Sequence, residues 1–249
     1  TNIMGTVNVL ESIRSVKSIK SVVIITTDKV YKISKKNKSY REQDRLEGFD
    51  PYSSSKVGTE LIVDCYIKSF FNNSHLKNKI STARAGNVIG GGDYSKNRLI
   101  PDILESMNKN KKLIVRNPNH TRPWQHVIDP LMGYLILAEK QYKNLENKKK
   151  EHCWNFGPNK ENFKKVIYII KCMKNYKKFN FTINKSKKLK ETKILRLNSS
   201  KAKKRLKWRP VWNLKKTLIK VNEWNLHVCN GFSAKNICEK QFLMYLDGK

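Results

Sequence analysis

The sequence predicts an α/β protein, with a doubly wound parallel sheet and a second, smaller α/β domain toward the C-terminus. Helix-like and strand-like segments alternate at short spacing, which is typical of parallel sheets. The run SVVIITT (21–27) is β-branched and apolar without alternation, as in strands that are buried on both faces. A hydrophobic fraction of 39% in 249 residues is enough for a packed core.

Each element follows from a local pattern. A helix is expected over 2–16, where apolar residues recur on one face, and the strand 21–27 follows it. After a polar loop (35–43), a second helix is expected over 52–70 and a strand over 80–85. The remaining elements are helices over 99–107, 130–141, 163–176, 199–206 and 214–228, and strands over 113–116, 124–128, 153–157, 179–183 and 194–197.

The charge is extreme, with 52 Lys and Arg against 20 acidic residues and a formal net charge of +32. A nucleic-acid-binding module is one interpretation of this charge. However, only ten of the basic residues are Arg, and the Lys residues are scattered rather than clustered with aromatic residues. A generally lysine-rich surface therefore explains the composition better than a specific nucleic-acid site.

The five Cys and five His residues show no CxxC or HExxH spacing. We therefore expect no metal site and no disulfide framework, but reduced thiols in the cytoplasm. There is no run of 18 apolar residues that would span a membrane and no visible signal peptide. The first residue is Thr1 rather than Met, which leads us to expect a piece of a longer gene product.

Tyr52 and Lys56 form a YxxxK pair within the second expected helix. Residues four apart lie on one helical face, so the ammonium would stand near the phenol and lower its pKa from about 10. Such a Tyr can take a proton from a substrate hydroxyl. Alone, the motif is weak, because a solvated helix face gives the same pattern.

Polar residues at the ends of two expected strands strengthen this interpretation. Thr27, Asp28 and Lys29 follow the strand 21–27, and Arg84 and Asn87 lie at the end of the strand 80–85. The carboxyl ends of parallel strands line the ligand crevice of an open sheet. Turn capping explains one of these residues more easily than the whole set.

The blocks TTDKVY, DPYSSSKVGTELI, AGNVIGGGD and RPWQHV give the chain a specific resemblance. It resembles the extended short-chain dehydrogenases/reductases, and within them the nucleotide-sugar 4,6-dehydratases that act on CDP-glucose. The resemblance implies an incomplete Rossmann-like domain that binds NAD and a C-terminal domain that binds the nucleotide sugar. The expected boundaries are 1–88 and 124–150 for the NAD-binding domain, and 89–123 and 151–249 for the nucleotide-sugar domain.

The resemblance also implies catalytic roles. Tyr52 would take the proton of the sugar 4-hydroxyl, Lys56 would lower the pKa of Tyr52 and bind the nicotinamide ribose, and Thr27 would hydrogen-bond the same hydroxyl. Asp28 would protonate the departing 6-hydroxyl. Lys29 stands where related dehydratases carry Glu, and the choice between a C5 base and an electrostatic stabiliser stays open, because an ordinary Lys is protonated at pH 7.

Asn87, Arg98 and Arg122 match positions near the sugar-nucleotide phosphates in this family, and an Arg fork suits a diphosphate. For Arg98 and Arg122, ordinary surface charge is the competing interpretation. The family also implies a homodimer formed through the helices 1–16 and 52–70, and a role in O-antigen or similar surface-polysaccharide synthesis.

The Gly-rich first turn that binds the pyrophosphate of NAD does not occur in the sequence, since GGGD (90–93) follows a late strand. We therefore expect an N-terminally truncated enzyme, with weak or absent NAD binding and an exposed sheet edge. Three alternatives stay open: another nucleotide-sugar epimerase or dehydratase, a basic nucleic-acid-binding module, and an inactive fragment.

Overall fold

The computed structural model describes residues 1–34, 38–143, 152–184 and 195–248, and the chain divides into two compact units. Unit 1 comprises Thr1–Gly86, Pro130–Gly157 and Arg196–Arg209. Unit 2 comprises Asn87–Asp129, Pro158–Leu195 and Pro210–Lys249. Each unit is therefore assembled from three separate stretches of the chain.

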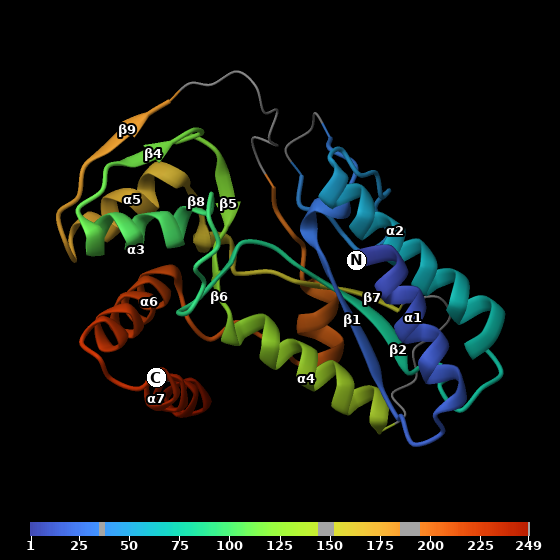
Figure 1. Cartoon of the computed structure of the whole chain (residues 1–249). Coiled ribbons are helices and arrows are strands. Elements are labelled where there is room, and N and C mark those ends of the chain that lie inside the picture. The colour runs from blue at the N-terminus through green and yellow to red at the C-terminus, as the bar shows by residue number, and fades with distance from the viewer. Residues whose placement is uncertain (35–37, 144–151, 185–194, 249) are drawn as a thin grey trace. The chain divides into compact units, whose positions relative to one another are not determined.

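Unit 1 is built on a parallel sheet with the strand order β1-β2-β7 (Figure 1). All six residues of β2 are buried, as expected for a central strand covered on both faces. The strands are β1 (Val22–Thr27), β2 (Ile80–Ala85) and β7 (Cys153–Phe156). The helical segments that unit 1 contains wholly or in large part are α1 (Asn2–Ser15), η1 (Asp28–Val30), α2 (Pro51–Tyr66), η2 (Ile67–Phe71), α4 (Ile128–Tyr142) and η4 (Ala202–Leu206).

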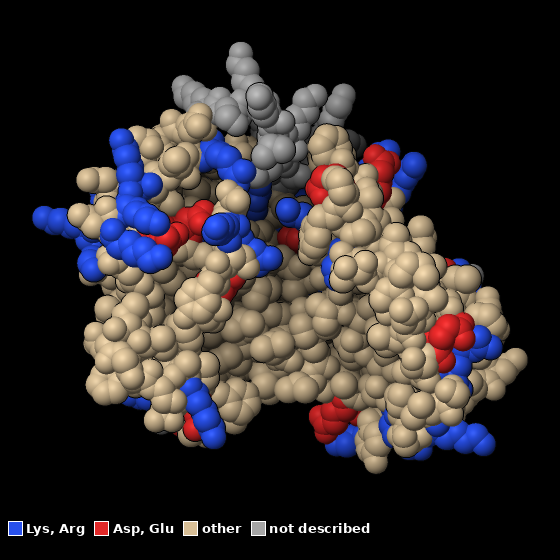
Figure 2. Space-filling view, viewed as in Figure 1, with Lys and Arg blue, Asp and Glu red and all other residues tan. Residues whose placement is uncertain are grey.

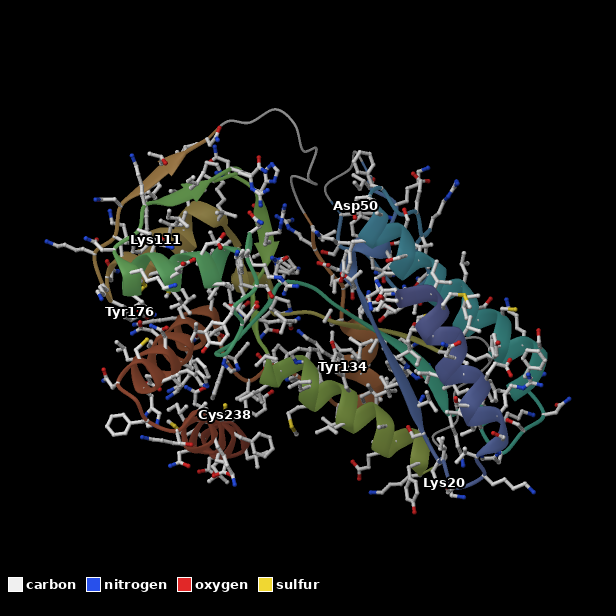
Figure 3. All side chains as sticks on the ribbon, viewed as in Figure 1. Lys20, Asp50, Lys111, Tyr134, Tyr176 and Cys238 are labelled. Atoms are coloured by element: carbon white, nitrogen blue, oxygen red, sulfur yellow. The ribbon has the colours of Figure 1, made fainter. Side chains whose placement is uncertain are left out.

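Helices pack on both faces of this sheet. On one face, Leu10 of α1 and Val63 of α2 join a buried apolar cluster with Ile80 of β2. On the other, the ring of Phe156 in β7 meets Tyr134 of α4, which is labelled in Figure 3, and Trp208 edge-on. The doubly wound α/β class expected from the sequence is therefore confirmed.

Unit 2 has short two-stranded sheets and an apolar core formed mainly by helices. β3 pairs with β6 and β4 with β9, both parallel, whereas β5 pairs with β8 antiparallel. The strands are β3 (Val88–Ile89), β4 (Leu113–Val115), β5 (Thr121–Pro123), β6 (Gln125–His126), β8 (Phe163–Lys165) and β9 (Phe181–Ile183). The helices are α3 (Leu99–Lys109), η3 (Lys160–Asn162), α5 (Val166–Lys174), α6 (Leu214–Cys229) and α7 (Ala234–Leu246).

Several expected elements differ in the structure. The helix expected over 163–176 starts only at Val166, because 163–165 form β8 against β5. The strand expected over 124–128 is limited to Gln125–His126. Of the strand expected over 194–197, residue 194 lies outside the described residues, and the rest forms a single bridge between Tyr40 and Leu197. Helix α7 was not expected at all.

The unit boundaries also differ from those expected. The segment 151–249 was expected in the second domain, yet β7 pairs with β2 in register from Thr82 with Cys153 to Ala85 with Phe156. Residues 196–209 likewise belong to unit 1, and 124–129 belong to unit 2. The sequence did not show these boundaries because β7 follows a stretch rich in Lys and Asn (142–150), and the expected domain boundary lay at the end of this stretch. In the described part of the chain, no helix combines the length and hydrophobicity that crossing a bilayer requires.

Candidate active site

Thr27 and Asp28 lie at the carboxyl end of β1 and are both buried. The Thr27 hydroxyl donates to Asp28 Oδ1 at 3.2 Å and accepts from the Lys29 backbone N–H at 3.3 Å. This capping arrangement starts η1 directly after the strand. It therefore leaves the Lys29 side chain exposed beside two buried polar groups.

Gly86 follows β2 in the chain and leaves room for the Asp28 carboxylate. A Cβ atom at this position would lie 1.8 Å from Asp28 Oδ2 and 2.3 Å from its Cγ. The end of β2 therefore approaches the Asp28 side chain so closely that only a residue without a side chain fits. The ends of β1 and β2, which the sequence predicts to lie at the same edge of the sheet, therefore meet at Asp28 and Gly86.

Asp50 fixes the start of α2 (Figure 3). Its carboxylate accepts from the Ser53 backbone N–H, and the Ser53 hydroxyl accepts from the Asp50 backbone N–H, both at 2.9 Å. Together with Pro51 in the first turn, this capping box sets the first helical residue. Tyr52 consequently lies in the first turn of α2.

The two lysines of the predicted site hold different positions. The Lys29 Nζ lies 5.8 Å from the centroid of the Tyr52 ring, which is itself 48% exposed. The Lys56 Nζ donates to the Ile25 carbonyl of β1 at 3.0 Å. Burial lowers the pKa of Lys56, and the negative charge of Glu60 opposes that effect. Lys56 is thus bound to the strand, while Lys29 is the lysine placed near the aromatic ring.

All five residues expected to be catalytic, Thr27, Asp28, Lys29, Tyr52 and Lys56, lie where the end of β1 and η1 meets the first two turns of α2. The arrangement offers a hydroxyl, a carboxylate, two ammonium groups and a half-exposed phenol. These groups can donate and accept protons around a hydroxylated ligand.

Arg84 is not at the rim of a crevice, where its position at the end of β2 had placed it. Its side chain is 2% exposed and forms an ion pair with Glu60 of α2 at 2.7 Å. The sequence analysis missed Glu60, although it follows Lys56 by four residues and so shares its helical face.

Asn87 begins unit 2 with a φ of 41°, in the left-handed region that Asn tolerates better than most residues. Its carbonyl accepts from the Gln125 backbone N–H at 3.3 Å, so its main chain is tied to the start of β6. The positive φ is the backbone feature that distinguishes this expected substrate-binding residue.

Arg98 and Arg122 differ in how they are held. The Arg98 side chain is 67% exposed and lies 3.5 Å from the Asp93 carboxylate, an ion pair that water screens. Arg122 is half-buried in β5, donates to the Thr121 carbonyl at 3.0 Å and lies 3.2 Å from His120 Nδ1. Arg122 is therefore the more constrained of the two.

The Lys and Arg side chains on the viewed face of unit 2 gather over α3, β4 and β9 (Figure 2). Lys109 and Lys111 at the end of α3 both pair with the exposed Glu105. Surface pairs of this kind are typical of a solvated lysine-rich face.

The sequence profile of the GDP-mannose 4,6-dehydratase family matches residues 1–221. The chain belongs to this family. A CDP-glucose 4,6-dehydratase from Salmonella typhimurium is 42% identical over 230 residues, which cover 90% of the chain and 64% of that relative. The chain therefore spans slightly less than two thirds of the length of this family relative.

Solved structures give the same fold. A dTDP-glucose 4,6-dehydratase from Bacillus anthracis in complex with NAD superposes with a TM-score of 0.74 at 23% identity, covering 90% of the chain and 67% of that structure. DesIV, a dTDP-glucose 4,6-dehydratase from Streptomyces venezuelae, reaches 0.76 at 18% identity, covering 94% and 68%. The Rossmann-like fold expected for this GDP-mannose 4,6-dehydratase family member is thus confirmed.

Proposed function

We propose that the chain carries the catalytic and nucleotide-sugar-binding residues of a CDP-glucose 4,6-dehydratase, which converts CDP-D-glucose to CDP-4-keto-6-deoxy-D-glucose and water. The observation that carries the proposal is the convergence of Thr27, Asp28, Lys29, Tyr52 and Lys56 at the end of β1. The 42% identity to the Salmonella enzyme supports CDP-glucose over other nucleotide sugars. A cytoplasmic setting and surface-polysaccharide synthesis stay part of the proposal through the same resemblance.

NAD is the proposed cofactor, and the donors present fit its ribose. Lys56 uses one of its three N–H groups on the Ile25 carbonyl, which leaves donors for ribose hydroxyls, and the Tyr52 phenol is accessible. When bound, the nicotinamide supplies a reversible hydride acceptor. The given sequence holds no Gly-rich turn for the pyrophosphate of NAD. Lys56 and Tyr52 are therefore proposed to bind only the nicotinamide end of the cofactor.

In the proposed reaction, different residues of the chain carry out the separate proton transfers. Tyr52 takes the proton of the sugar 4-hydroxyl while Thr27 orients that hydroxyl by a hydrogen bond. Elimination of water across C5 and C6 then needs a proton for the departing 6-hydroxyl, which Asp28 supplies. The positive charge of Lys56 stabilises the phenolate form of Tyr52 from the neighbouring turn of the helix.

Lys29 acts at C5 in this proposal. Its ammonium lies near the Tyr52 ring and is exposed, so it is available to a sugar bound at the end of β1. Either it accepts the C5 proton, or it stabilises the enolate that forms next to the 4-ketone. Asn87, Arg98 and Arg122 are the proposed substrate-binding residues, the two arginines pairing with the diphosphate.

The test is a product analysis by proton NMR. The purified chain is given saturating NAD and, separately, CDP-, dTDP-, UDP- or GDP-glucose, and the new C6 methyl signal of the 6-deoxy product is followed. We expect the methyl signal with CDP-glucose and a loss of about 10²–10⁴-fold in rate for Tyr52→Phe. Tyr94→Phe is the matched control, because Tyr94 is 78% exposed and belongs to unit 2. Preference for another sugar nucleotide, or no methyl product with any of them, contradicts the proposal.

A homodimer formed through α1 and α2 is part of the same proposal. The two helices pack on each other, since Asn2 donates to Ser55 and Tyr66 to Glu11. They still expose Met4 at 61% and Leu61 at 60%, which gives this helix pair apolar outer surface. Light scattering after size exclusion is expected to show a dimer for the wild type and a monomer for Leu61→Glu; a monomeric wild type contradicts it.

A further inference from the structure

Glu60 and Arg84 form a buried ion pair beneath the candidate site. Both side chains are 2% exposed, and the guanidinium binds both carboxylate oxygens, Nε to Oε1 at 2.7 Å and Nη2 to Oε2 at 2.9 Å. A two-point contact of this type fixes the relative orientation of its partners as well as their separation.

Two strands share the Glu60 carboxylate. The Thr26 hydroxyl of β1 donates to Oε1 at 2.6 Å, and the Thr82 hydroxyl of β2 donates to Oε2 at 2.7 Å. With Arg84, each carboxylate oxygen has a charged and a neutral donor, and Oε2 also accepts from the Cys153 thiol of β7 at 3.7 Å. One side chain of α2 thereby ties the helix to two adjacent strands.

Arg84 extends the connection to the segments after β1. Its Nη1 donates to the Tyr31 hydroxyl at 2.9 Å and to the Glu42 carbonyl at 3.0 Å. Tyr31 directly follows η1, which contains Asp28 and Lys29. The ion pair therefore joins α2, both strands and the segment that follows η1.

We propose that Glu60, held by Arg84 and Thr26, is a positioning residue that sets Lys56 and Tyr52 of α2 against the end of β1; their roles rest on the proposed function. Glu60 lies one helical turn after Lys56. Thr26, its partner in β1, directly follows Ile25, whose carbonyl binds the Lys56 ammonium. The two contacts between α2 and β1 thus fall on adjacent strand residues, so a shift at one displaces the other.

The charge of Glu60 acts in the same direction. Burial raises its pKa, but the hydrogen bonds and charge of Arg84 outweigh that effect, so the pKa of Glu60 lies below its ordinary value. The carboxylate is therefore negative at neutral pH. This charge opposes the burial that lowers the pKa of Lys56. Removing it leaves Lys56 less protonated as well as less firmly placed.

The experiment separates positioning from simple stabilisation. Glu60→Gln alone leaves Arg84 buried without its counter-charge, so the denaturation midpoint should fall sharply. The double variant Glu60→Met with Arg84→Met removes both charges and should recover most of that loss. Thr26→Val keeps the ion pair and removes the hydroxyl that ties Glu60 to β1, together with its longer contact to the Ala83 carbonyl at 3.5 Å. It decides the question if the double variant does not fold.

The primary readout is the reactivity of Lys56 toward an amine-acylating reagent from pH 6 to 10, measured by mass spectrometry of the Lys56 peptide without substrate. The double variant removes the Glu60 charge and is expected to raise the Lys56 rate at neutral pH. Thr26→Val keeps that charge and is expected to raise the rate less, through the looser placement of Lys56 alone. Lys29 in the same protein is the internal reference. Glu105→Gln is the matched control, because it removes an exposed carboxylate paired with lysines in unit 2.

Turnover of CDP-glucose is the second readout. A positioning role predicts a kcat at least about tenfold lower with little change in KM, even where stability has recovered. An unchanged Lys56 reactivity profile in every folded variant overturns the inference. If the wild type makes no product, the proposed function fails, but the Lys56 profile still decides whether Glu60 positions this lysine.

Discussion

The Asp28 carboxylate occupies the space in which a side chain at Gly86 would lie. Gly86→Ala should therefore force Asp28 or the end of β2 to move, at a cost of about 1–3 kcal/mol in the free energy of unfolding. Chemical denaturation measures this loss. Gly5→Ala is the control, because nothing lies within 4 Å of a Cβ at that position in α1. There we expect about 0.5–1 kcal/mol of stabilisation. Equal effects at the two glycines would contradict the close approach.

The Asp50 cap gives a second prediction. Asp50→Ala removes the acceptor of the Ser53 backbone N–H and should cost about 0.5–2 kcal/mol, as for other helix N-caps. Ser233→Ala is matched to it, because Ser233 precedes α7 without a side-chain capping bond. Urea denaturation should show little change for Ser233→Ala. A similar loss in both variants would mean that the capping box does not stabilise α2.

Asp129 gives unit 2 a stability that falls with rising pH. Burial raises its pKa to about 6, although the hydroxyl of Tyr245 and the backbone N–H of Val211 both donate to it. The folded state therefore holds a proton that the unfolded chain releases near pH 4. Its contribution is present below pH 4 and is lost as the pH rises through 6, by roughly 3 kcal/mol. Unfolding free energies of wild type and Asp129→Asn at pH 4 and 7 measure it; a constant difference between them contradicts the prediction.

His126 acts in the opposite direction within unit 2. Burial lowers its pKa to about 4, with a smaller effect of the same sign from the charge of Lys220. The unfolded chain takes up a proton near pH 6.5 that the folded state does not, so stability rises with pH between about 4 and 6.5. His126→Asn should abolish this rise and leave the decline due to Asp129. A pH profile identical to that of the wild type would show that His126 does not titrate in this way.

The sequence predicted unit 1 more accurately than unit 2. The strand 21–27 and the capped start of α2 carry strong local signals, a β-branched apolar run and the Asp50-Pro51 pair. The strands of unit 2 are two or three residues long and formed by pairing between distant segments, so no local periodicity identifies them. Residues 163–165 are an example. Apolar spacing alone predicts a helix there, but pairing with β5 makes these residues a strand.

The candidate site, too, could be predicted from the sequence only in part. Thr27, Asp28 and Tyr52 could be placed together because consecutive strands of a parallel sheet end at one edge and α2 starts there. The Glu60–Arg84 pair could not, since its members are 24 residues apart and lie on different elements. The expected substrate-binding roles of Asn87, Arg98 and Arg122 stay predictions.

The interleaving of the two units has a consequence for synthesis on the ribosome. β7 is translated after the first of the three stretches of unit 2, and the segment 196–209 after the second. Until β7 emerges, β2 lacks one of its two neighbours, and its apolar surface is open to association with other nascent chains. Neither unit is completely translated before a large part of the other, so this protein should depend on chaperones more than two consecutive domains of the same size would.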